Sequence, residues 1–366
     1  MPDRKVVILG GSGTFGRHIA EQLAALPDTR LAIAGRRPDK GVPVATSLRA
    51  EFRPCDTHDP ASLSKAVEGA WLVVNASGPF RAGDYSVPRA CVDLGCHYID
   101  IADGRDYVAG VGQLDGAARA RRVFACAGAS TTPAITSALV AELRPGLGRI
   151  RSIRVALNAG NRNPAGASTV ATILGYVGRP VRVWRGGRWR LLRGWGAAEF
   201  VAFPPPVGRR RVQLCDVPDL ELFPRLFGAD EVIFKAGLEL TAFNYAVAAL
   251  GALRHIVPSL DLPRLAGPVV ALSRCFKRFG TLHGACAVWV TDDAGRRKSL
   301  ALVARENGPR IPGSPAVLLA RKLLSGRLGE VGAFPCVGFL GAADYAAFLA
   351  PYSIFLVKGE GRAWAS

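Results

Sequence analysis

The chain has 366 residues, of which 49% are hydrophobic and 21% are charged, and its formal net charge is +18. This length suffices for two domains with buried cores, and the composition excludes a disordered or fibrous chain. The basic residues are spread along the chain without a DNA- or RNA-binding motif, so no nucleic-acid partner is expected. An acidic ligand, an anionic membrane surface or a bias in composition would each account for the charge.

The cysteine and histidine spacing predicts no metal site. The eight cysteines are scattered without a Cys-x-x-Cys pair, and no Cys/His cluster has the spacing of zinc ligands. We therefore expect no metal, and reduced, mostly buried thiols in a cytoplasmic protein.

Two apolar stretches are considered as a signal peptide and as a membrane-spanning helix. Val6–Leu9 is too short for the apolar part of a signal peptide, so we expect no export. Leu240–Leu253 is shorter than the roughly 20 residues that a membrane-spanning helix needs. It predicts a buried helix, with a helix lying in a membrane interface as the alternative.

A strand, a glycine-rich turn and a helix are expected at the amino terminus. Val6–Leu9 has the apolar, β-branched composition of a strand buried on both faces. The turn after it consists of Gly10, Gly11, Ser12, Gly13, Thr14, Phe15 and Gly16. Such glycines let backbone N–H groups approach a pyrophosphate at the positive end of the next helix, which predicts a dinucleotide site. A second strand at Leu31–Ala34 favours this reading over an ordinary glycine turn.

The end of the second strand indicates which dinucleotide binds. NAD enzymes usually place Asp or Glu there, to bind the ribose hydroxyls. This chain has Arg36 and Arg37, two guanidinium groups suited to the 2′-phosphate of NADP. Surface arginines without a ligand are the alternative in so basic a chain.

Further cofactor contacts are expected after the third and fourth strands. Asp56 follows a short strand at Glu51–Cys55 and is placed to contact the adenine end. Trp71–Val74 predicts a fourth buried strand, and the loop after it consists of Asn75, Ala76, Ser77, Gly78, Pro79 and Phe80. Ligands in open α/β sheets bind at the carboxyl ends of the strands, so this loop should line the nicotinamide side of the cofactor, with Phe80 toward the substrate.

These segments resemble the saccharopine dehydrogenase-like family of NADP-binding oxidoreductases. The matching stretches are GGSGTFGRHIAEQLA (10–24), AIAGRR (32–37), LVVNASGPF (72–80), ACVDLGCHYIDIADG (90–104) and GASTTPAITSALV (128–140). The resemblance implies a Rossmann domain, an α+β domain inserted after it, and a carboxyl-terminal segment that returns to the first domain.

The resemblance also implies roles for individual residues. The pyrophosphate would lie on residues 11–15, the 2′-phosphate on Arg36 and Arg37, and the rest of the cofactor along residues 75–79. Ser130, Thr131 and Thr132, which precede a helix, would face the active cleft; their hydroxyls would bind a substrate carboxylate or cap the helix. Family members act on amino-acid conjugates, carboxylated polyamines or lipid-linked intermediates, so the resemblance leaves the substrate open.

Four polar residues near the end of another predicted strand are candidates for proton transfer. His97, Tyr98, Asp100 and Asp103 would lie at the sheet edge where ligands bind, and any of them could carry a proton during reduction of a C=N, C=O or C=C bond. Packing and turn capping are the alternative roles. Family members often read HYxDxxGE, whereas here Asp103 precedes Gly104, so the acidic group is shifted. The rival short-chain dehydrogenases need Tyr-x-x-x-Lys, which none of the seven tyrosines provides.

The second half of the chain predicts an α+β domain with a mainly antiparallel sheet. Ile150–Leu157 alternates like a strand, Arg182–Arg193 like a hairpin, and Gly280–Ala294 like a strand paired with Leu300–Ala304. We expect a Rossmann domain over 1–145, a substrate or dimerisation domain over 146–330, and a segment over 331–366 that returns to the Rossmann domain.

The sequence therefore predicts an NADP(H)-dependent oxidoreductase. It would transfer hydride to or from a C=N, C=O or C=C centre of a small-molecule substrate that is acidic or lipid-linked. We expect a homodimer, and peripheral contact with a membrane is a further possibility. The alternatives are a non-catalytic NADP-binding or membrane-surface protein, and an enoyl reductase acting on lipid-linked chains.

Overall fold

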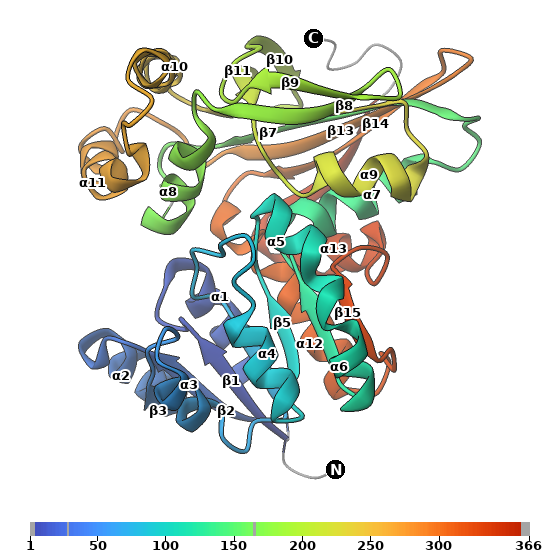
Figure 1. Cartoon of the computed structure of the whole chain (residues 1–366). Helices are drawn as coiled ribbons and strands as arrows, with labels where there is room; N and C mark the ends of the chain where they lie inside the picture. The colour runs from blue at the N-terminus through green and yellow to red at the C-terminus, as the bar shows by residue number, and fades with distance from the viewer. Residues whose placement is uncertain (1–3, 28, 164–165, 360–366) are drawn as a thin grey trace. The chain divides into compact units, whose positions relative to one another are not determined.

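The computed structural model describes residues 4–27, 29–163 and 166–359, and the chain divides into two units. Unit 1 consists of residues 1–135 and 309–340, and unit 2 of residues 136–308 and 341–366. Each unit has a β-sheet of its own, which can be followed in Figure 1 by the strand labels.

Unit 1 is built on a parallel sheet. In the described residues its strands lie in the order β15 (Gly332–Pro335), β6 (Phe124–Ala127), β5 (His97–Asp100), β4 (Leu72–Asn75), β1 (Arg4–Leu9), β2 (Thr29–Gly35) and β3 (Glu51–Pro54). The pairings are parallel, so the carboxyl ends of the strands lie at one edge. The strand order reverses at β1, which pairs with β2 on one side and β4 on the other, and doubly wound sheets bind ligands at this reversal.

Helices pack around this sheet, with α1 against α12 and α4 against both α3 and α6 (Figure 1). The helices of unit 1 are α1 (Thr14–Ala24), α2 (Pro38–Ser47), α3 (Pro60–Val67), α4 (Ser86–Asp93), α5 (Arg105–Gly110), α6 (Asp115–Ala120) and α12 (Ser314–Leu324). The central strands are buried on both faces, as their apolar sequences predict: Val6, Ile8 and Val73 have no exposed surface. The predicted Rossmann fold is confirmed.

Unit 2 contains a mixed, mainly antiparallel sheet, also as predicted. Its strands lie in the order β10 (Glu199–Phe203), β11 (Gly208–Leu214), β12 (Glu231–Leu238), β7 (Ile150–Ala159), β13 (Gly284–Asp292), β14 (Arg297–Ala304) and β16 (Ile354–Gly359). The β12–β7 pair is parallel and the others in this order are antiparallel. The predicted hairpin is β8 (Pro180–Arg185) with β9 (Trp189–Arg193), and β8 also pairs with β12.

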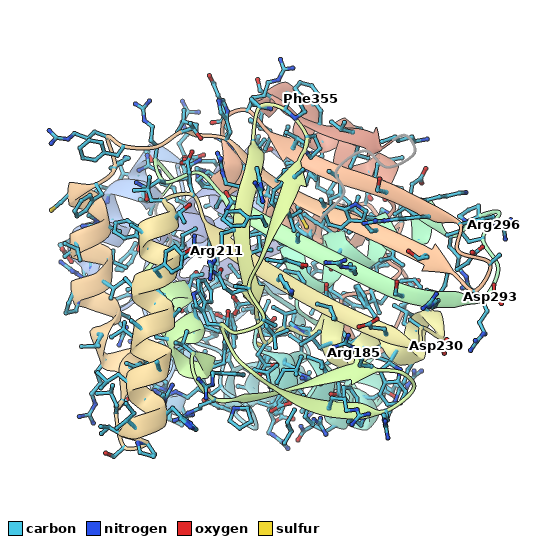
Figure 2. All side chains as sticks on the ribbon, turned by 90° about the horizontal axis from the view of Figure 1, so that it is seen from above. Arg185, Arg211, Asp230, Asp293, Arg296 and Phe355 are labelled. Carbon is cyan, nitrogen blue, oxygen red and sulfur yellow. The ribbon has the colours of Figure 1, made fainter. Side chains whose placement is uncertain are left out.

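The helices of unit 2 are α7 (Thr136–Leu143), α8 (Ala167–Tyr176), α9 (Asp219–Phe227), α10 (Thr241–Ile256), α11 (Ala266–Cys275) and α13 (Ala342–Leu349). The helices α10 and α11 stand next to each other at one end of the sheet in both views (Figures 1 and 2). In the described ranges no helix has both the length and the hydropathy that crossing a bilayer requires.

The segment that returns to unit 1 differs from the expected residues 331–366. Residues 309–340 join unit 1, because α12 packs on α1 and β15 pairs with β6 at the edge of the parallel sheet. From residue 341 the chain belongs to unit 2, where β16 pairs with β14. The first boundary falls after residue 135 and not after 145, since α7 belongs to unit 2.

The expectation of a buried helix at Leu240–Leu253 is wrong. A helix forms there, but the only residues of α10 that are buried are Asn244, Gly251 and Arg254. Its large apolar side chains are half-buried or exposed. The cysteine prediction fares better, since seven of the eight thiols are buried and only Cys275 is exposed.

Candidate functional site

The glycine-rich turn closes tightly between β1 and α1. Gly10 has φ of 74°, and a Cβ on it would lie 2.9 Å from the carbonyl oxygen of Ala76. A Cβ on Gly16 would run into the carbonyl oxygen of Gly10, to which the Gly13 N–H donates over 2.9 Å. These two glycines are therefore required for the turn to close, and the loop after β4 lies directly against it.

The N-terminus of α1 is open to an anion. Gly13 occupies the N-cap without a side chain to accept from the helix, and the first turn contains no acidic residue. Gly13 and Thr14 are exposed, Ser12 and Phe15 are half-buried, and Gly11 is buried. The first N–H groups of the helix and its positive dipole end are thus available to a pyrophosphate.

The two arginines after β2 are not equivalent. Both are exposed, but Arg37 is held by the carboxylate of Asp39, with Nη2–Oδ2 of 2.7 Å and Nε–Oδ1 of 3.2 Å. Arg36 has no such partner in the part of the chain that the structure describes, so its guanidinium is the freer of the two to take a phosphate. Asp56 accepts from the His58 N–H over 3.1 Å and shapes the turn after β3.

The loop after β4 is fixed by Asn75, which is 3% exposed. Its Oδ1 accepts from the Ser77 N–H over 2.9 Å and from the Ser77 hydroxyl over 2.6 Å. Its Nδ2 donates to the Tyr98 hydroxyl over 3.0 Å. Residues 75–77 therefore keep one conformation beside the glycine turn.

Asp100 joins the loops at the carboxyl edge of the sheet. Its fully buried carboxylate accepts from the N–H of Gly128 (2.8 Å), the N–H of Ala102 (3.0 Å) and the Tyr107 hydroxyl (2.9 Å). The Tyr107 hydroxyl lies 3.4 Å from that of Tyr98, which continues the network to Asn75. The ends of β4, β5 and β6 are thus held together by one buried carboxylate.

Two carboxylates of this edge have raised pKa values. Burial raises the pKa of Asp100 to about 6, against the lowering effect of its hydrogen bonds. Burial also raises the pKa of Asp103, half-buried in the loop after β5, to about 6. Burial and the nearby Asp100 charge raise the pKa of Tyr107, so this phenol stays protonated.

His97 lies apart from the other three candidates for proton transfer. It is the first residue of β5, not the last, and therefore sits at the amino edge of the parallel sheet, opposite the ligand edge. Its Nδ1 accepts from the Phe124 N–H over 2.9 Å, and its ring is 4.4 Å from that of Trp71. Burial and the nearby Arg4 lower its pKa, which keeps the ring neutral.

A shallow, open hollow with a cavity volume of about 40 Å³ lies beside the loop after β4. It is lined by Thr57, His58, Asn75, Ser77, Pro79, Phe80, Arg81, Asp84, Ser86, Val87, Pro88 and Tyr107. The prediction had included Asn75, Ser77, Pro79 and Phe80 but had missed Tyr107. Nothing in the pattern around Tyr107 indicated that α5 would turn its hydroxyl toward Asp100.

Ser130, Thr131 and Thr132 are buried, at 6–7% exposed. The backbone holds them close to the carboxyl edge, since the Ala129 N–H donates to the Asp100 carbonyl over 2.7 Å. Thr132 Oγ1 is buried without a hydrogen-bond partner among the described residues, so it is the member of this group that could accept or donate to a ligand. No group of His, Cys, Asp and Glu in the described residues could hold a metal ion.

The amino-terminal part of the chain matches known proteins. Residues 6–137 match the family model described as the saccharopine dehydrogenase NADP binding domain, which confirms NADP as the cofactor and the resemblance drawn from the sequence. A probable mitochondrial saccharopine dehydrogenase-like oxidoreductase of Arabidopsis thaliana is 32% identical over 125 residues, covering 29% of this chain and 27% of the relative. The saccharopine dehydrogenase-like oxidoreductase of Mus musculus is 33% identical over 114 residues, covering 26% and 27%. The matched region thus spans about a quarter of these relatives.

Two solved structures share the fold over nearly the whole chain. Saccharopine dehydrogenase (L-Glu forming) from Saccharomyces cerevisiae superposes with a TM-score of 0.68 at 12% identity, covering 97% of this chain and 99% of that one. The homospermidine synthase of Legionella pneumophila, in complex with NAD, has a TM-score of 0.66 at 12% identity, covering 98% and 92%. At this identity the likeness concerns the fold.

Proposed function

We propose that the protein is an NADP(H)-dependent oxidoreductase acting on a small molecule, because residues 6–137 match the saccharopine dehydrogenase NADP binding domain. One observation carries this proposal. The N-terminus of α1 is open to an anion, and the guanidinium of Arg36, after the next strand β2, is free to bind a phosphate because it is Arg37 that Asp39 holds. Bound NADPH would supply a hydride for a C=N, C=O or C=C bond.

The cofactor would lie along the carboxyl edge of the unit 1 sheet. Residues 10–16 fit a pyrophosphate, since a Cβ at Gly10 or Gly16 would fill the space into which the backbone turns. Arg36 would bind the 2′-phosphate, with Arg37 as a weaker second contact because Asp39 already holds it. Asp56 would contact the adenine end, and residues 75–79 would bound the nicotinamide side.

The hollow lined by Ser77, Phe80 and Arg81 would take the substrate. Arg81 suits a carboxylate, and Phe80 with Tyr107 (ring centroids 5.4 Å apart) suits an apolar portion. The Ser130–Thr132 loop would contribute hydroxyls. The substrate would thus be a small acid with an apolar part.

Of the four candidate proton carriers, Asp103 fits the role best. It lies at the carboxyl edge, and its pKa of about 6 lets it hold a proton below neutral pH. Asp100 is enclosed by three donors, and Tyr98 by Asn75 and Tyr107, so both would position the loops. If Asp103 donates the proton, kcat/KM for reduction falls as pH rises through about 6, and Asp103→Asn removes this limb of the pH profile.

The test of the cofactor assignment is a fluorescence titration with NADPH and NADH. Arg36→Ala should weaken NADPH binding by about 10- to 100-fold, the range for a charge-assisted hydrogen bond, and leave NADH unchanged. Arg37→Ala is the matched control and should have the smaller effect, because Asp39 already engages that side chain. An Arg36→Ala variant with unaltered NADPH affinity would contradict the assignment.

A non-catalytic NADP-binding protein is the second candidate, because the structure does not gather the four predicted proton carriers. It predicts NADPH binding with the same dependence on Arg36 but no NADPH oxidation with any imino, oxo or enoyl acid. Turnover of one such acid, lost in Asp103→Asn, would exclude this candidate.

A further inference from the structure

The outward face of α10 is uncharged. The exposed residues of this helix are Thr241, Ala242, Tyr245, Ala246, Ala249, Ala252, Leu253, His255 and Ile256. His255, near its end, is the only basic side chain among them, and Ile256 is 77% exposed. A surface helix of a globular protein normally turns its charged residues to solvent, so this face has the composition of a contact surface.

Two buried polar side chains anchor α10 to the rest of unit 2. The buried Asn244 exchanges two hydrogen bonds with the backbone of Leu238, one accepted (2.9 Å) and one donated (2.7 Å). The buried Arg254 donates from Nη1 to the carbonyls of Leu174, Gly175 and Val177 over 3.0–3.1 Å. Two buried polar side chains therefore anchor α10 near both of its ends, while Tyr245, Leu253 and Ile256 stay exposed.

The neighbouring helix α11 and the residues after it continue this surface. Leu272, Phe276 and Phe279 are exposed by 56%, 38% and 53%. Phe276 joins the two helices, because its ring lies 5.3 Å from that of Phe243 of α10. We call the "α10–α11 surface" the exposed residues Tyr245, Leu253, Ile256, Leu272, Phe276 and Phe279.

Exposed apolar side chains are concentrated on this surface. Of the fourteen large apolar residues that are exposed in the described part of the chain, six belong to this surface. Single exposed apolar residues are common in soluble proteins, but a contiguous group marks a site of interaction.

Cations border the apolar residues. Arg274, Lys277 and Arg278 are exposed and alternate with the phenylalanines, and the Arg278 guanidinium lies 4.6 Å from the ring of Phe279. The Arg211 guanidinium of β11, labelled in Figure 2, lies 4.3 Å from the ring of Tyr245. The nearby acids are already paired: Asp261 with Arg264 over 2.9 Å, and Glu239 with Arg210 over 3.2 Å. The charge of this region is therefore positive and uncompensated.

We propose that the α10–α11 surface binds an anionic phospholipid membrane, with the apolar side chains entering the interface and the basic ones contacting headgroups. Interfacial helices combine these same features, an apolar face and basic residues whose stems lie along it. A second copy of the chain is disfavoured as the occupant, because a twofold contact through this surface would bring like charges together.

The test is co-sedimentation of the full chain with vesicles of phosphatidylcholine alone or mixed with phosphatidylglycerol, at low and high salt. We expect binding only to the anionic vesicles, weakened by salt. The triple variant Arg274→Glu, Lys277→Glu, Arg278→Glu should lower the affinity by at least about 100-fold, since each basic residue near a membrane surface contributes roughly fivefold. Leu272→Glu with Ile256→Glu should also abolish binding.

The matched control is Arg188→Glu, Arg190→Glu, Arg193→Glu, which changes the net charge equally on the exposed β8–β9 hairpin and should leave binding within about twofold. Thermal unfolding and NADPH titration verify that each variant is folded. Because Cys275 is the one exposed cysteine and adjoins Phe276, a polarity-sensitive dye on it should shift to the blue with anionic vesicles only.

Three results would overturn the proposal. The first is absence of binding to anionic vesicles at low salt, and the second is equal loss in the control triple variant. The third is a dimer in sedimentation velocity that shields Cys275 from labelling and dissociates in Ile256→Glu, which would assign the surface to a second copy.

Discussion

Helices α1 and α10 place their apolar residues in opposite ways. In α1 the buried residues include Ile19, Ala20 and Leu23, which is the side expected to face the sheet. In α10 the buried residues are Asn244, Gly251 and Arg254, while Leu253 and Ile256 are exposed. An apolar helix sequence predicts that the helix makes apolar contacts. Which residues are buried in the fold, apolar ones in α1 and polar ones in α10, decides whether those contacts are made within the chain.

The largest loss of stability is expected from replacing Asp100, whose buried carboxylate holds the loops of unit 1 together. Asp100→Ala leaves two N–H groups and the Tyr107 hydroxyl without an acceptor, which should lower the free energy of unfolding by about 3 kcal/mol or more. Asp100→Asn retains an acceptor oxygen and should lose less. Urea denaturation measures both, and equal stability of wild type and the alanine variant would show that the network does not hold these loops.

A pair of identical substitutions tests the comparison of the two helices. Leu23→Ala in α1 removes a fully buried side chain and should cost about 3 kcal/mol of unfolding free energy. Leu253→Ala in α10 removes a side chain that is 46% exposed and should change it by less than about 0.5 kcal/mol. Similar losses in urea denaturation for the two variants would mean that Leu253 is covered within the folded chain.

The polar attachment of α10 predicts a local effect. Arg254→Ala leaves three carbonyls at the end of α8 without their donor and should weaken the attachment of α10 by about 2 kcal/mol. Amide hydrogen exchange should rise in residues 241–256 and stay unchanged in unit 1. Uniform exchange in both units would instead indicate global destabilisation.

The stability of the protein should also depend on pH through Asp100. Because the pKa of Asp100 is raised from 3.8 to about 6 in the folded state, folding binds its proton between these values. Its contribution is present below pH 3.8 and is lost as pH rises through about 6, with a slope of at most about 1.4 kcal/mol per pH unit. Asp100→Asn should reduce the slope of unfolding free energy against pH in this window by about half, because the pKa of Asp103 is raised over the same range. An unchanged slope would assign the effect to other groups.

The sequence predicted unit 1 better than unit 2 for a physical reason. Its turn at Gly10–Gly16 and its buried strands follow from local patterns, and those patterns also gave the cofactor. The exposed placement of α10 could not be predicted, because it depends on Arg254 reaching carbonyls 77–80 residues earlier in the chain. The Tyr107 hydroxyl meets Asp100 only where α5 turns back over the end of β5, which no local pattern indicates. His97 was expected near the end of its strand, but it is the first residue of β5.

The interleaving of the two units constrains how the chain folds during synthesis. The parallel sheet gains its edge strand β15 only after the residues of unit 2 up to 308 have been made, and the sheet of unit 2 gains β16 last of all. Neither unit can therefore be completed while the other is absent from the growing chain. We expect that the parallel sheet stays open at its β15 edge throughout the synthesis of residues 136–308, so that the two sheets are completed in overlapping steps rather than one after the other.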